Sequence, residues 1–186
     1  SISQDSEHGL LTTTTAYLPG FQTMVTNPNG AKTQTIYQVF DQPTYDYPAG
    51  VSEYGGDRHT EIYRDSFGKV TALRRRNGSG SESAWRRYVY DANQLLCKAI
   101  EPETGATVMA YDGAGNLAWS AAGQHNLASA ANCNTAEGYG SGRRVDRTYD
   151  TRNRLKTMAF PDSNGNQAWN YTADGLPSSV VTVNSE

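Results

Sequence analysis

The sequence has little of what membrane spans and enzyme sites are usually made from. No apolar run approaches the roughly 20 residues that a membrane helix needs. The formal net charge is only -3, so charge alone gives no reason to expect nucleic acid or an anionic membrane as a partner. The first residues contain neither an initiating Met nor a signal-peptide apolar region. We expect the chain to be a piece of a longer protein.

Residues that could carry out catalysis or bind a metal do not gather in any motif. The three histidines lie in polar stretches, with no Gly-x-Ser-x-Gly elbow near them. The segment 162–166 (D-S-N-G-N) superficially resembles a calcium loop, but its Gly is misplaced and no Glu follows at position twelve. The segment 138–142 (G-Y-G-S-G) lacks the preceding strand of a phosphate loop. We therefore expect a non-enzymatic protein with no catalytic residue, no metal site and no cofactor.

The residues that are abundant favour short strands and turns. The chain has 12 Tyr and 18 Gly, but only 4 Phe and 3 Trp. Tyr and Thr suit pleated, half-buried surfaces, whereas Gly and Asn suit turns. No segment shows a convincing helical period. The composition predicts an all-β protein.

A Tyr-Asp pair followed by a turn and an apolar residue recurs along the chain. Asp112 lies 21 positions after Asp91, and Asp150 lies 38 positions after Asp112. An insertion of about 17 residues in the second interval restores the period of the first. A looser copy ends at Asp65. A period near 21 is the length of two short strands and two turns, so each copy predicts one hairpin.

The residues around each Asp have the chemistry of a tight turn. Asp at the first position can accept hydrogen bonds from the backbone that follows. The position three residues later requires a left-handed conformation, which suits Gly or Asn but not Gln94. The predicted structural turn residues are Asp65, Asp91, Asp112, Asp150, Gly68, Gly115 and Asn153. Apolar anchors follow each Asp by five positions, at Val70, Leu96, Leu117 and Leu155. We expect the tyrosines to pack between neighbouring hairpins.

The segments differ enough in composition to predict a domain organisation. Residues 1–10 are polar, and we expect them to be frayed. Residues 11–186 are predicted to form one β-sheet domain. Within it, residues 121–142 are rich in Gly, Asn, Ala and Ser and have no periodicity, which predicts an inserted surface loop.

The repeated pattern resembles that of a known family. The sequences Y-D-G-A-G-N-L at 111–117 and Y-D-T-R-N-R-L at 149–155 are similar to the YD repeat of bacterial Rhs proteins and their relatives. The chain departs from that pattern at Arg64 and Gln94, in a shortened copy over 171–176, and in the insertion. The Asp-Pro-x-Gly-Leu motif of aspartyl self-cleavage is not found.

The resemblance implies a fold and a function. The implied fold is all-β, with repeated antiparallel β-hairpins in one continuous curved or spiralling sheet. In such proteins the sheet forms a shell that encloses a toxic C-terminal domain, or is part of a secreted or cell-surface bacterial polypeptide. The expected function is therefore a structural segment of such a shell. The alternative is an extracellular binding module for carbohydrate or another surface ligand.

The same resemblance indicates what this chain would contact. It is too short to close a shell, and open sheet edges invite pairing. The expected partners are neighbouring repeats of a longer chain, another copy at an edge, or an enclosed toxin domain. No nucleic acid partner and no membrane span are expected.

Two cysteines, Cys97 and Cys133, leave two alternatives open. They are either separate thiols or a disulfide. The position of Cys133 favours the disulfide, because a thiol in its polar loop would be exposed. A disulfide would close a loop of 36 positions, contribute roughly 4 kcal/mol in the chain-entropy model, and imply an oxidising compartment.

Arginines flank the polar tip at 77–83. Arg74, Arg75 and Arg76 precede it and Arg86 and Arg87 follow it, and the candidate patch consists of Arg74, Arg75, Arg86 and Arg87. They should face one another across a hairpin, where like charges are mildly destabilising. They form either a solvated strand face with acidic neighbours or a patch for an acidic partner, such as an anionic polysaccharide, an acidic cargo or nucleic acid.

Overall fold

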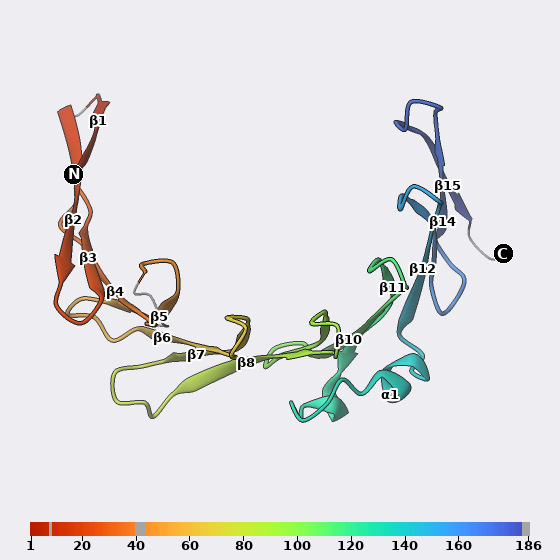
Figure 1. Cartoon of the computed structure of the whole chain (residues 1–186), viewed down its shortest axis with the longest axis horizontal. Coiled ribbons are helices and arrows are strands. Elements are labelled where there is room, and N and C mark those ends of the chain that lie inside the picture. Colours follow the sequence, from red (N-terminus) through yellow and green to blue (C-terminus); the bar gives the residue numbers. More distant parts are fainter. Residues whose placement is uncertain (8, 40–43, 184–186) are drawn as a thin grey trace. The chain divides into compact units, whose positions relative to one another are not determined.

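The structure is a computed structural model that describes residues 1–7, 9–39 and 44–183. Its regular structure is almost entirely β-strand, and strands that follow one another in sequence pair antiparallel (Figure 1). This confirms the predicted all-β fold of repeated antiparallel hairpins. The chain divides into two compact units, Ser1–Arg86 and Arg87–Glu186, where the sequence predicted one domain over residues 11–186.

The first unit is a succession of seven strands and the start of an eighth. Each strand pairs with the next one along the chain. The strands are β1 (Ile2–Ser6), β2 (Gly9–Leu18), β3 (Gln22–Thr26), β4 (Lys32–Tyr37), β5 (Pro48–Glu53), β6 (His59–Arg64) and β7 (Val70–Arg76). The eighth strand, β8 (Ser83–Tyr90), begins in this unit.

The second unit continues the same pattern and adds two short helices. The register of β8 with β9 runs from Arg87 to Tyr90. The further strands are β9 (Leu96–Glu101), β10 (Gly105–Tyr111), β11 (Leu117–Gln124), β12 (Arg144–Tyr149), β13 (Leu155–Ala159), β14 (Asn166–Tyr171) and β15 (Pro177–Val183). Between β11 and β12 lie a 3-10 helix, η1 (His125–Leu127), and one helical turn, α1 (Thr135–Tyr139).

The first residues of the chain are not frayed, contrary to the sequence prediction. Strand β1 pairs with β2 from Ile2 opposite Thr13 to Ser6 opposite Gly9. The hydroxyls of Ser3 and Thr12 also lie within hydrogen-bonding distance, at 3.0 Å. The polar composition did not predict this strand. Backbone hydrogen bonds hold the pair without a buried apolar face, and Ile2 itself remains 79% exposed.

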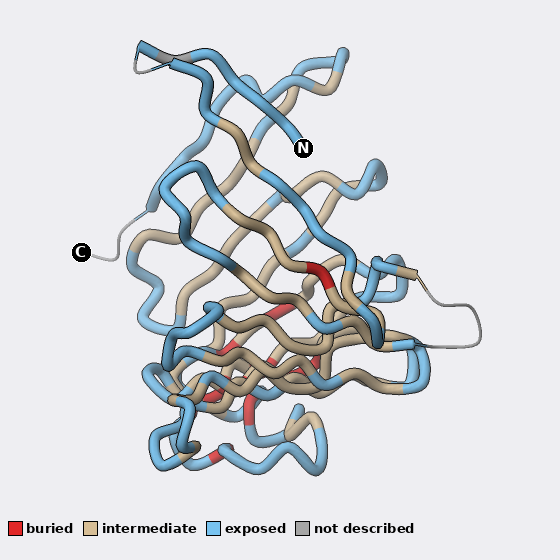
Figure 2. The backbone as a smooth tube through the Cα atoms, turned by 90° about the vertical axis from the view of Figure 1, so that its left-hand side faces the viewer, coloured by how far each residue is buried: buried red, intermediate tan, exposed pale blue. Residues whose placement is uncertain are grey.

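Few of the described residues are fully buried, as the short red stretches in Figure 2 show. Most of them belong to the second unit. Its apolar core consists of Ile100, Ala106, Val108, Trp119, Ala121 and Leu127. A single layer of hairpins exposes both of its faces, so a second layer is needed to bury a core. In this unit that layer is the segment between β11 and β12.

This segment differs from the predicted surface loop over 121–142. Strand β11 extends to Gln124, so the first four residues of the predicted insertion belong to the sheet. The remainder packs on the sheet, since Leu127 and Gly138 are buried. The name "insertion" is used below for residues 125–143, which include η1 and α1. Its lack of periodicity reflects its short helices, which are not long enough to show an amphipathic pattern.

Candidate functional site

One five-residue turn occurs at six places in the described residues and joins successive strands. Its first residue is Asn27, Asp65, Asp91, Asp112, Asp150 or Thr172. In all six turns, the backbone N–H of the first residue donates to the carbonyl of the fifth at 2.9 Å. The N–H of the fourth residue donates back to the carbonyl of the first at 2.9–3.1 Å. The turn therefore satisfies its own backbone with bonds between residues at most four positions apart.

The aspartates add a second set of hydrogen bonds inside this turn. In each of the four, Oδ1 accepts from the backbone N–H of the third and the fifth residue at 2.8–3.0 Å. The side-chain amide of Asn116 donates to Asp112 at 3.1 Å, and this bond lowers the pKa of the Asp112 carboxyl. The Arg154 guanidinium bonds Asp150 at 2.7 Å and lowers its pKa to about 2. These carboxylates act as turn acceptors for the backbone.

The fourth position of the turn is left-handed in every copy. The φ angles are 83° at Gly30, 78° at Gly68, 83° at Gly115, 58° at Asn153 and 88° at Gly175. Gln94, which the sequence prediction rejected for this position, adopts it too, with φ 64°. A residue with a Cβ there costs roughly 1–2 kcal/mol, and the rest of that hairpin must compensate for the strain.

The final copy is not shortened, contrary to the sequence prediction. Thr172 replaces Asp, and its hydroxyl accepts from the N–H of Leu176 at 3.1 Å. Tyr171 is then opposite Pro177, in the same register as Tyr111 opposite Leu117. The prediction failed because the copy was ended at Leu176, whereas Pro177 occupies the anchor position opposite Tyr171.

The tyrosine directly before three of these turns joins its hairpin to the previous one. Tyrosine hydroxyls donate to the carbonyls of the leucine anchors of the preceding turn: Tyr111 to Leu96 at 2.8 Å, Tyr149 to Leu117 at 3.1 Å, and Tyr171 to Leu155 at 2.7 Å. The sequence predicted tyrosine packing between hairpins but missed these bonds. The position of Tyr directly before the turn was the available signal.

The insertion is fastened to the sheet by a disulfide and by close packing. Cys97 and Cys133 are joined by a disulfide, the second of the two alternatives left by the sequence. Gly138 lies against β10, where a Cβ on Gly138 would come within 2.7 Å of the Val108 side chain. Nearby, the rings of Trp119 and Tyr139 meet edge to face with centroids 5.6 Å apart. The glycine of the G-Y-G-S-G segment thus serves helix–sheet packing.

A lysine is completely buried under the insertion. Lys98 of β9 is 0% exposed, and its Nζ donates to the backbone carbonyl of Ser129 and to Oδ1 of Asn134, both at 2.5 Å. The Asn134 amide donates to Glu137 Oε1 at 3.2 Å. Burial lowers the pKa of Lys98, while the charge of Glu137 opposes that shift. Sequence reasoning missed this lysine, although its place in the apolar run L-L-C-K-A-I was a signal.

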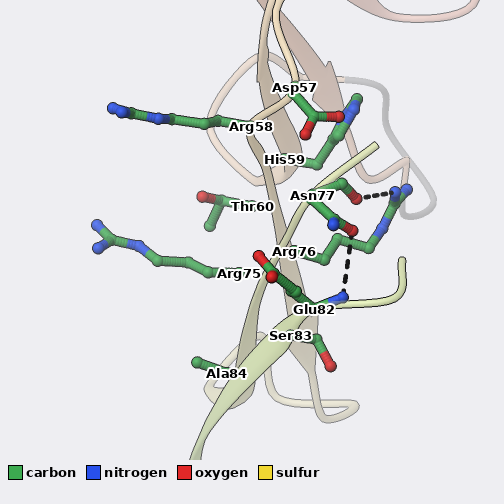
Figure 3. Close-up of a pocket in the computed structure, with 10 residues that line it drawn as sticks. All are labelled: Asp57, Arg58, His59, Thr60, Arg75, Arg76, Asn77, Glu82, Ser83 and Ala84. Carbon is green, nitrogen blue, oxygen red and sulfur yellow. Dashed lines mark hydrogen bonds between the residues drawn. The ribbon is translucent and has the colours of Figure 1, made fainter. Parts of the chain in front are cut away.

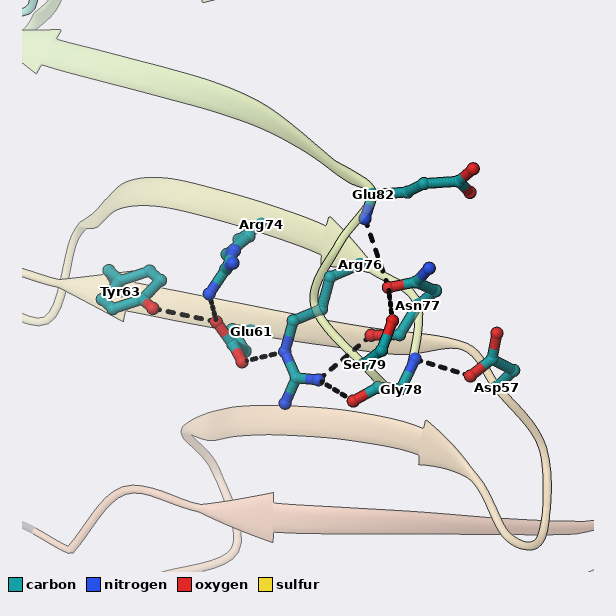
Figure 4. Close-up of polar contacts among 9 residues, drawn as sticks. All are labelled: Asp57, Glu61, Tyr63, Arg74, Arg76, Asn77, Gly78, Ser79 and Glu82. Atoms are coloured by element: carbon teal, nitrogen blue, oxygen red, sulfur yellow. Dashed lines mark hydrogen bonds and ion pairs between the residues drawn. The ribbon is translucent and has the colours of Figure 1, made fainter.

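In the first unit, three polar side chains of one sheet face donate to the carboxylate of Glu61 (Figure 4). It accepts from Arg76 Nε at 2.6 Å, Arg74 Nη1 at 3.5 Å and the Tyr63 hydroxyl at 2.9 Å. The bond from Arg76 is the largest cause of the lowered pKa of Glu61. The Arg74 guanidinium also lies 5.3 Å from the ring centroid of Trp85. Arg74 is therefore held by its neighbours on this face.

The arginines predicted as one acidic-partner patch do not form a single patch. Successive residues of a strand point to opposite faces, so Arg74 and Arg75 separate, as do Arg86 and Arg87. Figure 3 shows Arg75 extending to the same side as Arg58 and Thr60, beside a hollow of about 770 Å³. Neither Arg58 nor Arg75 has an acidic partner among the described residues.

Two features are absent from the described part of the chain. Within it, no three His, Cys, Asp or Glu side chains are grouped so that they could hold a metal ion. Also within it, no helix has the length and apolar character required to cross a membrane.

Comparison with known proteins gives weak similarity to solved structures alone. No family model matches the chain, and no curated protein matches it. Among solved structures, the chain is similar to the crystal structure of TcdB2-TccC3-Cdc42, with a TM-score of 0.36 and 13% sequence identity. The similarity covers 88% of this chain, which spans 11% of the length of the solved chain.

Proposed function

We propose that the chain is a non-enzymatic structural module, a segment of an Rhs-type hairpin-repeat shell that encloses or carries a toxin polypeptide for secretion and delivery. The observation that carries the proposal is the tyrosine link between hairpins. Tyr111, Tyr149 and Tyr171 each donate to the carbonyl of a leucine anchor of the preceding turn. Contacts of this kind, made only with the nearest copy, build an array that can be extended by adding further repeats.

The side chains that might suggest an active site are already used by the scaffold. The aspartates of the repeated turn accept backbone hydrogen bonds, and the tyrosine hydroxyls donate to backbone carbonyls. Large apolar side chains nevertheless remain exposed, such as Tyr17 at 68% and Phe67 at 71%. An enclosed polypeptide would cover side chains of this kind, which supports a carrying role.

The structure of the full-length gene product tests the proposal. Electron cryomicroscopy is expected to show further Tyr-Asp hairpins in register with these and a second polypeptide segment inside the array. Limited proteolysis should leave that segment intact while the exposed turns are cut. A full-length product without additional repeats, or one whose repeats enclose nothing, would refute the proposal.

A second candidate function rests on the hollow beside Arg58 and Arg75. Two guanidinium groups on one sheet face, with no acidic partner among the described residues, suit an anionic carbohydrate at a bacterial surface. Heparin binding at low salt is the test, with Arg58→Ala plus Arg75→Ala as the variant. Arg143→Ala plus Lys156→Ala removes the same charge from the second unit and is the control. Equal loss of binding in both variants would show a general charge effect and contradict a site.

A further inference from the structure

Three side chains with complementary chemistry meet where the insertion covers the sheet. The Lys98 amine lies 2.5 Å from Oδ1 of the Asn134 side-chain amide. The nitrogen of that amide donates to the Glu137 carboxylate at 3.2 Å. An amine nucleophile, an amide carbonyl and a carboxylate base are therefore in consecutive contact.

We propose that Lys98 and Asn134 form an intramolecular isopeptide bond, with Glu137 moving the protons. The proposal concerns a modification of the chain itself and does not depend on the proposed shell function.

The reaction needs no oxidant, reductant or cofactor. The Lys98 nitrogen forms a bond to Cγ of Asn134, and the bond from Cγ to Nδ2 breaks. Glu137 takes a proton from the Lys98 nitrogen and gives it to the departing nitrogen. The products are a secondary amide between the two side chains and one ammonia molecule, and Glu137 returns to its starting state.

Burial makes the amine a better nucleophile than an exposed lysine. An amine attacks only in its neutral form, and the removal of water from Lys98, which is 0% exposed, favours that form. The Ser129 carbonyl accepts a second hydrogen bond from Nζ and directs the amine toward Asn134. The site also holds the two reacting groups at a fixed distance, which replaces a bimolecular encounter by an intramolecular one.

The disulfide aligns the two reacting residues. Cys97 and Cys133 directly precede Lys98 and Asn134 in sequence, and their disulfide brings the two backbone segments together. The backbone of Asn134 is itself left-handed, with φ 53°, and its carbonyl accepts the N–H of Gly138 at 2.9 Å. Asn134 is therefore fixed at the start of α1, with Glu137 one turn later.

The two cross-links would close almost the same loop, and they differ in their resistance to thiols. The second link adds little loop-closure entropy once the first is present. An amide is not broken by thiols, so it would keep the insertion attached after the disulfide is reduced. The isopeptide bond would thus preserve the second layer of this unit in a reducing environment.

Mass spectrometry of the intact, fully reduced chain tests the proposal. The expected mass is lower than that of the sequence by one ammonia molecule. After proteolysis, the peptides that contain Lys98 and Asn134 should appear as one branched species. A mass equal to that of the unmodified sequence, with both peptides linear, would overturn the proposal and leave a hydrogen-bonded lysine.

Conservative variants separate the chemistry from a folding defect. Lys98→Arg and Glu137→Gln should each show the unmodified mass, while the exposed controls Lys156→Arg and Glu82→Gln retain the loss of ammonia. Asn134→Asp should lose water in place of ammonia and reach the same final mass as the parent chain. Formation of the branched peptide in Lys98→Arg would disprove the assignment of the nucleophile.

Discussion

The two units use the same turn but differ in what they bury. The turn at Asp65 in the first unit has the same hydrogen bonds as those at Asp91 and Asp112 in the second. Yet Thr23 is the one residue of the first unit that is buried among those described, whereas the second unit contains the whole apolar core. A repeated hairpin therefore sets local geometry without producing a core.

The source of the difference is the insertion between β11 and β12. Its residue Leu127 joins the core, and its Gly138 lies against Val108 of β10. Apolar burial stabilises by about 25 cal/mol per Å², so the covered hairpins gain free energy that a bare sheet lacks. We expect hydrogen exchange to be slower in β9–β11 than in β2–β7. The predictions below are ordered by the size of their expected effect on this contrast.

Removal of the disulfide should have the largest effect on the difference in stability between the two units. Cys97→Ala plus Cys133→Ala is expected to lower the unfolding free energy of the second unit by about 4 kcal/mol, because its unfolded state is no longer constrained. The full loss requires the Lys98→Arg background, since an amide at residues 98 and 134 would keep the same loop closed. Hydrogen exchange measured by mass spectrometry should speed up in β9–β11 and stay unchanged in β2–β7. Equal acceleration in both units would contradict this assignment.

Crowding the contact between the insertion and the sheet should have the next largest effect. Gly138→Ala places a Cβ within 2.7 Å of Val108, and overpacking of this kind costs roughly 1–3 kcal/mol. Gly142→Ala is the control, because a Cβ there meets nothing within 4 Å. Denaturant unfolding followed by tryptophan fluorescence compares the two variants. Similar midpoints for both would show that α1 does not need its close approach to β10.

Changes to the repeated turn should affect the two units similarly. Gly115→Ala forces an alanine to φ 83° and should cost roughly 1–2 kcal/mol. A Cβ at Gly113 also meets nothing within 4 Å, and no positive φ is found there, so Gly113→Ala is the matched control. Gly68→Ala, with φ 78°, applies the same test to the first unit. Thermal unfolding of the three variants would contradict the shared-turn interpretation if Gly113→Ala were the most destabilised.

Loss of a tyrosine hydroxyl tests the link between neighbouring hairpins. Tyr111→Phe removes the donor to the Leu96 carbonyl and should destabilise the second unit by about 1 kcal/mol. Tyr54→Phe, at a ring that is 59% exposed, is the control and should change little. Local hydrogen exchange in β9 and β10 is the measurement. Identical exchange in the two variants would mean that the hydrogen bond from the Tyr111 hydroxyl does not stabilise the contact between the hairpins.

Acid should reveal the smallest effect, at the Asp150 turn. Its pKa is held at about 2 by Arg154 and by the backbone N–H groups of the turn, below the ordinary value near 3.9 for an unfolded chain. A depressed folded pKa contributes stability that is present above about pH 4 and is lost as pH falls through about 2. NMR titration of the Asp150 carboxyl measures its pKa. The Asp150→Asn variant has no carboxyl to protonate at this position and should not show this loss of stability in acid. An apparent pKa at or above 3.9 would refute the stated contacts.

The sequence predicted the turns well because their chemistry is local. Asp at the first position and Gly or Asn at the fourth predict both the acceptor and the left-handed residue. The prediction weakened where the residue type changed, as at Gln94 and Thr172, whose backbone geometry still matches the others. These two copies are held by their surrounding strands as much as by their own residues.

Of the two alternatives for the arginines, the strand face with acidic neighbours fits Arg74, which pairs with Glu61. The single patch failed for a reason that was available in the sequence. A strand alternates its side chains with a period of two, so two adjacent arginines cannot share a face. The salt bridges from Arg74 and Arg76 to Glu61 follow the same rule, since all three residues lie on one face. The acidic partner could be identified only from the register, which places Glu61 opposite Arg74.

By itself, the sequence determined the hairpins, since each turn is closed by hydrogen bonds among five consecutive residues. Tertiary structure alone decided what is buried. Lys98 lies in a strand that, without the insertion, would leave its amine in water. It is buried because the segment carrying Cys133 and Asn134 folds back over β9. That choice depends on contacts between residues 36 positions apart, which no local pattern encodes.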